Sequence, residues 1–291
     1  MSLVQYQKDV KACKKVKGIR FLPKQTRQAS QVLCAFFSLF YDVARDPSVK
    51  DPNAIQRNLE EWKEVWKAAY DNVSGWSAKE DLPQECVPVL RATARVFHEY
   101  GIPYKYSEEF IAAMAQDTEK VEYQTYGELE KFMYGSVSVV CLALAHVIGF
   151  TDKRALLFAE EFGYAIALTN YLRDIKKDLE ERGHMYLPKA ERDSFGITKD
   201  QLLAHTVNEP FTRFMGFQMS RARALYVSAD EGVALLREDG RFAVRLAATL
   251  SEAILDEIEA QKYDIFSKPI RLSFFKKLSL LLGVRKAEKK R

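Results

Sequence analysis

Apolar residues recur at intervals of three and four along most of this chain, and the strict alternation of a half-buried strand is scarce. Such spacing gives each helix one apolar stripe, which is buried against another helix. Glycine and proline separate the periodic segments at points such as Asp51-Pro52, Gly149 and Gly240. We therefore predict an all-α protein. The expected helices cover about 24–46, 54–71, 83–100, 107–118, 126–148, 152–181, 199–205, 209–237, 241–263 and 269–282.

The expected helix at 126–148 is apolar on almost every side from Val137 to Ile148. A helix with apolar residues all round is buried in the core of a protein. Thr125 and Glu128 stand three apart just before the apolar run and form the pattern of a capping box, which predicts the helix start. We therefore expect this helix to lie inside a bundle.

The whole chain has the composition of a globular protein, with 47% apolar and 29% charged residues among 291. No low-complexity linker interrupts it, so we expect a single domain over 1–291 that ends in a basic tail at about 284–291. The net charge of +4 comes largely from this tail, and the body is close to neutral. A nucleic-acid partner is therefore not expected.

The cysteines and the hydropathy pattern bear on where the protein works. Cys13, Cys34, Cys86 and Cys141 show no CxxC spacing, which disfavours a zinc site or a disulfide framework and suits reduced thiols. The N-terminus lacks the apolar core of a signal peptide, and no run reaches the ~18 uncharged apolar residues that span a bilayer. We expect a cytoplasmic protein that is soluble or lies at the periphery of a membrane.

The stretch NYLRDIKKDLEERGHMYLP, which begins at Asn170, carries the clearest chemical signal. Asp174 and Asp178 are four apart with no glycine or proline between them, so a helix stacks their carboxylates on one face. Mg²⁺ takes oxygen ligands and is commonly held by one or two carboxylates plus substrate phosphates. The other interpretation is a solvated face with ordinary surface ion pairs. Four cations that suit a diphosphate surround the pair: Arg173, Lys176, Lys177 and Arg182.

The same stretch resembles a motif of a known family. Asn-x-Leu-Arg-Asp-x-x-x-Asp, followed by Arg-Gly and Tyr-Leu-Pro, is similar to the second Asp-rich motif of squalene and phytoene synthases. The resemblance implies a helical bundle of isoprenoid-synthase type around a central cavity, which binds farnesyl or geranylgeranyl diphosphate through Mg²⁺. It assigns catalysis and the metal to Asp174 and Asp178, and a catalytic role to Arg173. The residues that it assigns to the diphosphate are Asn170, Arg173, Lys177, Arg182 and Tyr186.

Three other segments carry the same resemblance. Tyr134-Gly135 matches the YCYGVAGTVG helix of the family, where the tyrosine lines the cavity near the reacting carbons, so Tyr134 is a candidate catalytic residue. The segment 114–132 is similar to the family's MxxDLxxxRYxTxxEL, which places Asp117 and Tyr123 near the cavity. The segment 262–282 resembles the end of bacterial phytoene synthases, where NYDVF leads into a basic, leucine-rich helix.

The last expected helix also has a chemistry of its own. Lysine and arginine flank an apolar face on it, which is typical of a helix that contacts an anionic membrane surface. The alternative is a helix that packs on the domain and leaves a solvated lysine edge. The apolar residues that can share the face are Phe274, Phe275, Leu278, Leu281 and Leu282.

The first Asp-rich motif of the family, Arg-x-x-Asp-Asp-x-x-Asp, is altered here. Aligned without gaps from Leu22-Pro23, its four positions fall on Ser38, Tyr41, Asp42 and Arg45. A shift by one residue recovers Asp42 and Asp46 but puts Leu39 in place of the arginine. Residues four apart share a helix face, so Asp42 and Asp46 are candidate metal ligands. The alternative is a pair of solvated acids at a helix end before Pro47.

The resemblance implies an enzyme, a Mg²⁺-dependent prenyltransferase that condenses two prenyl diphosphates head to head and releases pyrophosphate. Phytoene synthases and squalene or dehydrosqualene synthases catalyse this type of reaction, which belongs to isoprenoid and carotenoid biosynthesis. The altered first motif keeps two alternatives open. One is transfer of a single prenyl group to a different acceptor, and the other is a non-catalytic binding or assembly protein.

Overall fold

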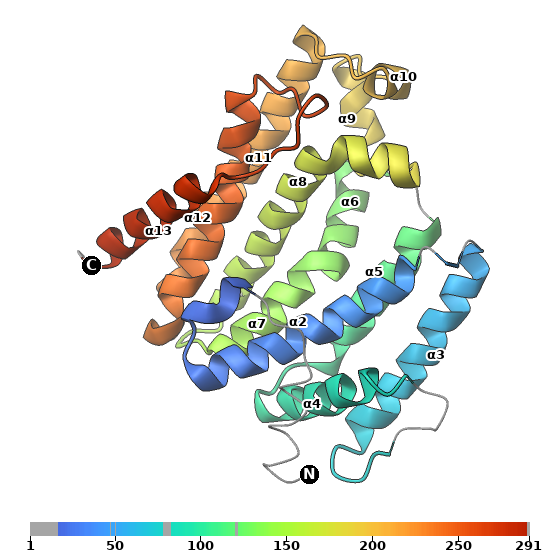
Figure 1. The fold of residues 1–291 in the computed structure, drawn as a ribbon, viewed down its shortest axis with the longest axis vertical. Helices are drawn as coiled ribbons and strands as arrows, with labels where there is room; N and C mark the ends of the chain where they lie inside the picture. Colours follow the sequence, from blue (N-terminus) through green and yellow to red (C-terminus); the bar gives the residue numbers. More distant parts are fainter. Residues whose placement is uncertain (1–16, 47, 50, 78–82, 120–121, 290–291) are drawn as a thin grey trace.

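The computed structural model shows a bundle of helices, and no strand occurs among the residues that it describes (Figure 1). These residues are 17–46, 48–49, 51–77, 83–119 and 122–289. Cys13, Pro47 and the last two residues of the basic tail lie outside them. The predicted all-α class is confirmed, whereas the single domain over 1–291 stays a prediction.

The bundle is built from helices of very different length. In chain order the elements are the 3₁₀ turn η1 (Lys17–Phe21), α2 (Lys24–Ala44), α3 (Pro52–Asp71), α4 (Cys86–Glu99), α5 (Tyr104–Glu119), α6 (Tyr126–Met133), the π-helical turn η2 (Tyr134–Ser138), α7 (Val139–Ile148), α8 (Ala155–Arg182), α9 (Lys189–Ser194), α10 (Lys199–Leu203), α11 (Glu209–Val233), α12 (Glu238–Ala260) and α13 (Phe274–Glu288).

Most helices lie within a few residues of their predicted positions, and three differences matter. The helix expected to reach residue 46 ends at Ala44, with Arg45 as its C-cap residue. α13 begins only at Phe274, because the Ser273 hydroxyl accepts the first-turn N–H of Lys276 at 3.1 Å, and it continues to Glu288. The sequence does not predict α9, because six residues are too few for a periodic pattern.

The stretch 126–148 forms one helical path that is interrupted by the π turn η2. Thr125 caps its start by accepting the N–H of Glu128 at 3.2 Å, as the sequence predicts. By length and composition the stretch would suffice to cross a membrane, but 56% of its most apolar window is buried inside the fold. It therefore has the burial of a core helix. Periodicity does not predict η2, and π turns are frequent at functional sites.

α8 runs through the middle of the bundle and contacts α7, α11 and α12 (Figure 1). Gly183 ends it in the left-handed conformation, with φ of 67°, which glycine adopts without strain. A Cβ at Gly163 would lie 2.4 Å from the Cα of Ser138, so only glycine lets α8 approach η2 this closely. This contact fixes α8, which carries the predicted diphosphate motif, against the core.

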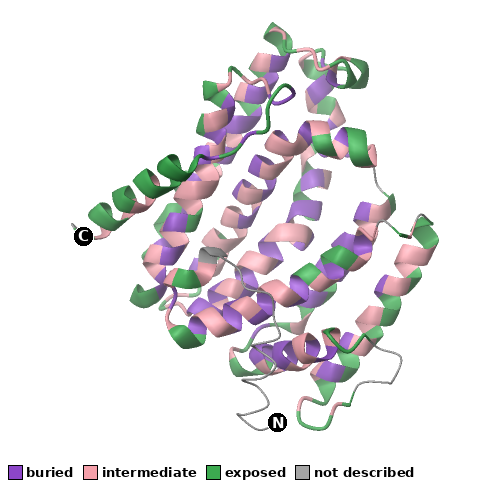
Figure 2. Cartoon of the chain, viewed as in Figure 1, coloured by how far each residue is buried: buried purple, intermediate pink, exposed green. Residues whose placement is uncertain are grey.

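α2 packs on the other side of the core against α3, α4, α5 and α7. Its Phe36 lies with its ring centroid 4.5 Å from that of Trp66, and the Trp66 indole N–H donates to Ser107 at 2.9 Å. Buried residues follow the inward faces of these helices, whereas α13 is largely exposed (Figure 2). The packing brings Arg45, at the end of α2, within reach of the end of α5.

Candidate active site

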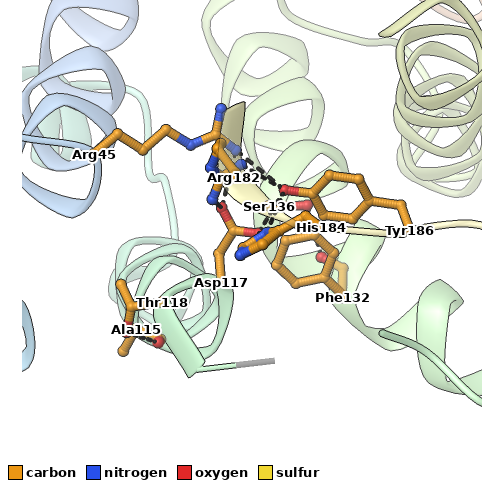
Figure 3. A network of polar contacts seen from close by, with 9 residues as sticks. All are labelled: Arg45, Ala115, Asp117, Thr118, Phe132, Ser136, Arg182, His184 and Tyr186. Atoms are coloured by element: carbon orange, nitrogen blue, oxygen red, sulfur yellow. Dashed lines mark hydrogen bonds and ion pairs between the residues drawn. The ribbon is translucent and has the colours of Figure 1, made fainter. Parts of the chain in front are cut away.

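The buried carboxylate of Asp117 pairs with two arginines that lie at the ends of α2 and α8 (Figure 3). Asp117 on α5 is only 1% exposed, and its Oδ2 lies 2.9 Å from the Arg45 guanidinium and 2.6 Å from that of Arg182. The Tyr186 hydroxyl donates to Asp117 Oδ1 at 2.7 Å, and His184 Nδ1 lies 3.5 Å from the same oxygen. These contacts tie the end of α2, the end of α5 and the segment after α8 together. We call the five residues the Asp117 cluster.

The cluster keeps its central carboxylate ionised. Burial alone raises the pKa of Asp117, but hydrogen bonds from His184 and Tyr186 and the charges of Arg182 and Arg45 outweigh it. Together they hold the pKa of Asp117 below its ordinary value. Burial and the neighbouring Asp117 charge raise the pKa of Tyr186 well above the ordinary phenol value, so its hydroxyl stays a neutral donor.

A wall of aromatic rings adjoins the cluster. Tyr186 stacks on Tyr171 of α8, with ring centroids 4.2 Å apart and planes within 12°. On Phe132 of α6 it stacks at 5.8 Å and 10°. The faces of such rings carry negative potential and attract cations. The site thus places guanidinium groups, whose N–H donors suit phosphate oxygens, beside ring faces that suit a cation.

The two carboxylates of the predicted metal site differ in their environment. Arg173 Nε donates to Asp174 Oδ1 at 2.8 Å, so Asp174 already has a cation. Burial, and then the charge of Asp174, raise the pKa of Asp178 to about 6, and the charges of Arg182 and Arg45 oppose the rise. The negative charge of the Asp178 carboxylate is therefore poorly compensated by its surroundings at neutral pH. Arg182 of the Asp117 cluster lies four residues after Asp178, on the same face of α8.

The acids near this face of α8 suit Mg²⁺ only together with a substrate that supplies further oxygens. Among the described residues of 17–289, no group of three or more His, Cys, Asp or Glu side chains lies close enough together to hold a metal. Mg²⁺, however, needs only one or two carboxylates when substrate phosphates and water complete its shell. An under-compensated Asp178 beside Asp174 fits that requirement, provided that the substrate supplies the remaining oxygens.

The other predicted diphosphate residues take different positions. Arg182 and Tyr186 belong to the Asp117 cluster, while Asn170 is half-buried on α8. Lys177 is exposed on the same helix, and the Lys176 ammonium donates to the Phe266 carbonyl at 3.0 Å. Their roles toward a diphosphate stay predictions.

Tyr134 and Phe132 have different neighbours. The charges that act on Tyr134 come from Glu160, Glu109 and Lys105, none of which belongs to the Asp117 cluster. The catalytic role of Tyr134 stays a prediction. Phe132, which the sequence does not single out, stacks on Tyr186 instead. Its only signal is its place two residues before Tyr134 in the same apolar helix.

The shared helix face expected of Asp42 and Asp46 is wrong, because α2 ends at Ala44. Asp46 lies beyond the helix, where its Oδ1 accepts the Ser48 N–H at 2.9 Å and the Ser48 hydroxyl at 2.6 Å. Those bonds lower the pKa of Asp46. Asp42 is exposed on α2. Their metal role stays a prediction that has lost its geometric basis.

An apolar cavity of about 290 Å³ lies at the other end of α8. Side chains from α2, α7, α8, α11 and α12 line it, among them Leu144, Phe158, Phe162, Val233 and Val244. Burial raises the pKa of the adjoining thiols Cys34 and Cys141 to about 11 and about 12, as expected of apolar surroundings. The cavity has the chemistry of a site for a hydrocarbon chain.

Comparisons with known proteins agree with this chemistry. A family described as squalene/phytoene synthase matches residues 16–276. A phytoene synthase of Arthrospira platensis is 33% identical over 186 residues, covering 60% of this chain and 60% of that protein. A 15-cis-phytoene synthase of Synechocystis sp. is 31% identical over 259 residues, covering 85% of this chain and 74% of that one. The chain spans only 48% of the Daucus carota phytoene synthase that it matches.

Solved structures show the same fold. A dehydrosqualene synthase crystal structure superposes with a TM-score of 0.81 at 24% identity, covering 99% of both chains. A squalene synthase of Alicyclobacillus acidocaldarius gives 0.78 at 21% identity, covering 90% of this chain and 97% of that one. The predicted isoprenoid-synthase type of bundle is confirmed.

Proposed function

Because this chain belongs to the squalene/phytoene synthase family, we propose that it condenses two prenyl diphosphates head to head. The substrates would be farnesyl or geranylgeranyl diphosphate. The observation that carries the proposal is that Asp174, Asp178 and Arg182 follow one another at four-residue intervals on one face of α8, where the Asp178 charge is poorly compensated. Acids and arginines around one space suit a Mg²⁺-diphosphate group, and aromatic rings adjoin them.

Each residue of the site would have its own role in the proposed reaction. Asp174 and Asp178 hold Mg²⁺, which as a Lewis acid stabilises the charge on departing pyrophosphate. Arg173, Lys177 and Arg182 would bind phosphate oxygens of the two substrates, and Asn170 would add an oxygen ligand for the metal. The ring faces of Tyr171, Tyr186 and Phe132 stabilise the allylic cation.

The first step breaks the C1–O bond of one prenyl diphosphate, and the bonding electrons leave with pyrophosphate. The double bond of the second substrate attacks the C1 cation, and a proton is lost as a cyclopropane closes. The product still carries one diphosphate. Loss of that group and of a second proton, with rearrangement, gives a symmetrical C30 or C40 hydrocarbon without a reductant.

Incubation with substrate tests the proposal directly. We expect the purified protein to release pyrophosphate from farnesyl or geranylgeranyl diphosphate in the presence of Mg²⁺ and to form a C30 or C40 hydrocarbon. Chelation by EDTA should stop the release. Release of neither product from either substrate would refute the proposal.

One observation favours a second candidate, the transfer of a single prenyl group to a different acceptor. Arg45 stands where an acid of the first Asp-rich motif is expected, and it pairs with Asp117. The same incubation separates the two, because pyrophosphate released without any C30 or C40 hydrocarbon would favour the second candidate.

We also propose that α13 contacts an anionic membrane surface. Phe274 is 73% and Phe275 80% exposed, and lysines and arginines lie along the same helix. Burying two exposed phenylalanines in lipid is worth about 1.5–3 kcal/mol each. A long hydrocarbon product also needs a lipid phase to receive it.

Vesicle binding tests this contact. We expect phosphatidylserine vesicles to sediment the protein and the double change Phe274→Ser and Phe275→Ser to weaken binding at least about tenfold. Leu157→Ser, which alters an exposed apolar residue on α8, should have no effect. Equal binding by the double variant and the unaltered protein would contradict the proposal.

A further inference from the structure

Arg45 turns the altered first motif into a cationic site. The ungapped alignment puts this arginine on the last acid of the motif Arg-x-x-Asp-Asp-x-x-Asp. As the C-cap residue of α2 it lies over the Tyr41 ring at 3.9 Å and reaches Asp117 at 2.9 Å. A position that would serve a metal through a carboxylate therefore offers N–H donors instead.

Two guanidinium groups share one oxygen of Asp117. Arg182 reaches Oδ2 at 2.6 Å, beside Arg45, and the Tyr186 hydroxyl takes the other oxygen. Two positive charges against one negative charge leave an excess of one positive charge. Because Asp117 is almost fully buried, it holds both guanidinium groups in fixed positions, as preorganised binding requires.

The guanidinium groups keep donors for a further acceptor. Their side chains are 25% and 23% exposed for Arg45 and Arg182, so an anion can reach them. Within the part of the chain that the structure describes, the buried Nε of Arg45 has no hydrogen-bond partner. That atom is closed off from solvent, so a ligand would have to bind the terminal N–H groups of the guanidinium.

The guanidinium pair borders the same space as the carboxylates of α8. Asp178 and Arg182 are four residues apart and share one face of α8, and Tyr186, which Arg182 contacts, stacks on Tyr171 of the same helix. Arg45 comes from the end of α2 and Arg182 from the end of α8, and their guanidinium groups meet at the same oxygen of Asp117 (Figure 3). A diphosphate on the pair would therefore lie beside a second diphosphate held at Asp174 and Asp178.

We propose that Arg45 and Arg182, fixed by Asp117, bind one of the two substrate diphosphates directly and without a metal. This inference rests on the proposed condensation of two prenyl diphosphates. Guanidinium groups recognise phosphate through paired N–H donors, whereas a carboxylate at the position of Arg45 would need a metal between it and the phosphate. Mg²⁺ then serves only the diphosphate at Asp174 and Asp178. The Arg45 and Arg182 site holds the acceptor, whose C1–O bond stays intact in the first step.

Calorimetric titration separates the two sites. The probe is a thiolodiphosphate analogue of farnesyl diphosphate, in which sulfur replaces the bridging oxygen and prevents ionisation. We expect one analogue bound per chain in EDTA and two in Mg²⁺. Asp178→Asn should remove only the Mg²⁺-dependent site.

Variants of Arg45 assign the EDTA-resistant site. Arg45→Met should weaken it by about 10- to 100-fold, the loss expected for hydrogen bonds to a charged group. Arg45→Lys should lose less, because it keeps the charge but not the paired donors. Arg154→Met, which alters an exposed arginine at the far end of α8, should change nothing. Circular dichroism verifies that each variant is folded, and Arg182 still pairs with Asp117 in the Arg45 variants.

Each outcome decides the question. Binding in Mg²⁺ with none in EDTA would overturn the inference and leave the proposed function standing. The same follows if Arg45→Met binds in EDTA as tightly as Arg154→Met does. No binding in either condition would refute the proposed function and the inference with it.

Discussion

Asp178→Asn is expected to abolish turnover and, at pH 7.5, to make the protein more stable. Turnover falls because a metal ligand is lost, and charge stabilisation by a metal is worth several kcal/mol, or at least about 10³-fold in rate. Stability rises because burial and Asp174 raise the pKa of Asp178 to about 6, so its charged form is disfavoured in the fold. A residue evolved only for stability would not show both effects.

The pH dependence has a definite sign. A carboxyl whose pKa is raised in the fold contributes stability fully below about pH 4, and this contribution is lost as pH rises through about 6. Asparagine does not titrate. The gain of Asp178→Asn should therefore reach about 1–3 kcal/mol at pH 7.5, after allowance for partial solvent screening, and be about half as large at pH 5.

Urea unfolding without metal at pH 5 and pH 7.5 measures the effect. Glu181→Gln, an exposed acid on the same helix, serves as the matched control and should stay within about 0.5 kcal/mol at both pH values. Mg²⁺ with pyrophosphate should stabilise the unaltered protein more than Asp178→Asn, which keeps only the proposed site at Arg45 and Arg182. An Asp178→Asn protein that is less stable than the unaltered chain at pH 7.5 would contradict this account of the site.

The sequence predicts the parts of the site that are local in the chain. Helical spacing alone predicts that Asp174 and Asp178 share a face of α8, and the capping pattern at Thr125 predicts where α6 begins. Asp117 is identified only by resemblance. Its contacts reach across 72 residues to Arg45 and 65 to Arg182, and no local pattern encodes such a meeting.

The sequence fails where tertiary packing decides. In the sequence, Arg45 is only a residue that replaces an acid of the first Asp-rich motif. The fold shows that it pairs with Asp117. The end of α2 at Ala44 also removes the helix face that Asp42 and Asp46 were expected to share. In the sequence, Phe132 does not differ from the other apolar residues of its helix. Only the fold shows that Tyr186 stacks on it. Local periodicity therefore predicts the acids on α8, and it does not predict the contacts of Arg45 and Phe132, which come from other helices.

Asp117→Asn is expected to be the most destabilising small change in the site. The substitution keeps the size of the side chain but removes the only negative charge between Arg45 and Arg182 in the Asp117 cluster. Breaking a buried ion pair by removing one partner costs about 3–5 kcal/mol. Because both arginines are partly exposed and keep some hydration, we expect the lower end, about 3 kcal/mol.

The pKa of Asp117 lies below its ordinary value, so its contribution is complete above about pH 4 and is lost as pH falls further. Urea unfolding at pH 7.5 therefore measures all of it. Asp152→Asn, which removes a partner of the exposed Arg154, should cost much less than Asp117→Asn.

A double variant shows whether the cost comes from the unpaired arginines. In a background of Arg45→Met, one of the two cations is already absent, so Asp117→Asn should cost clearly less than in the unaltered protein. Equal costs in both backgrounds would mean that Arg45 does not depend on Asp117. A smaller destabilisation by Asp117→Asn in the Arg45→Met background would show that the buried carboxylate of Asp117 holds α2, α5 and the end of α8 together. It would also show that Arg45 and Arg182 need this carboxylate to lie side by side.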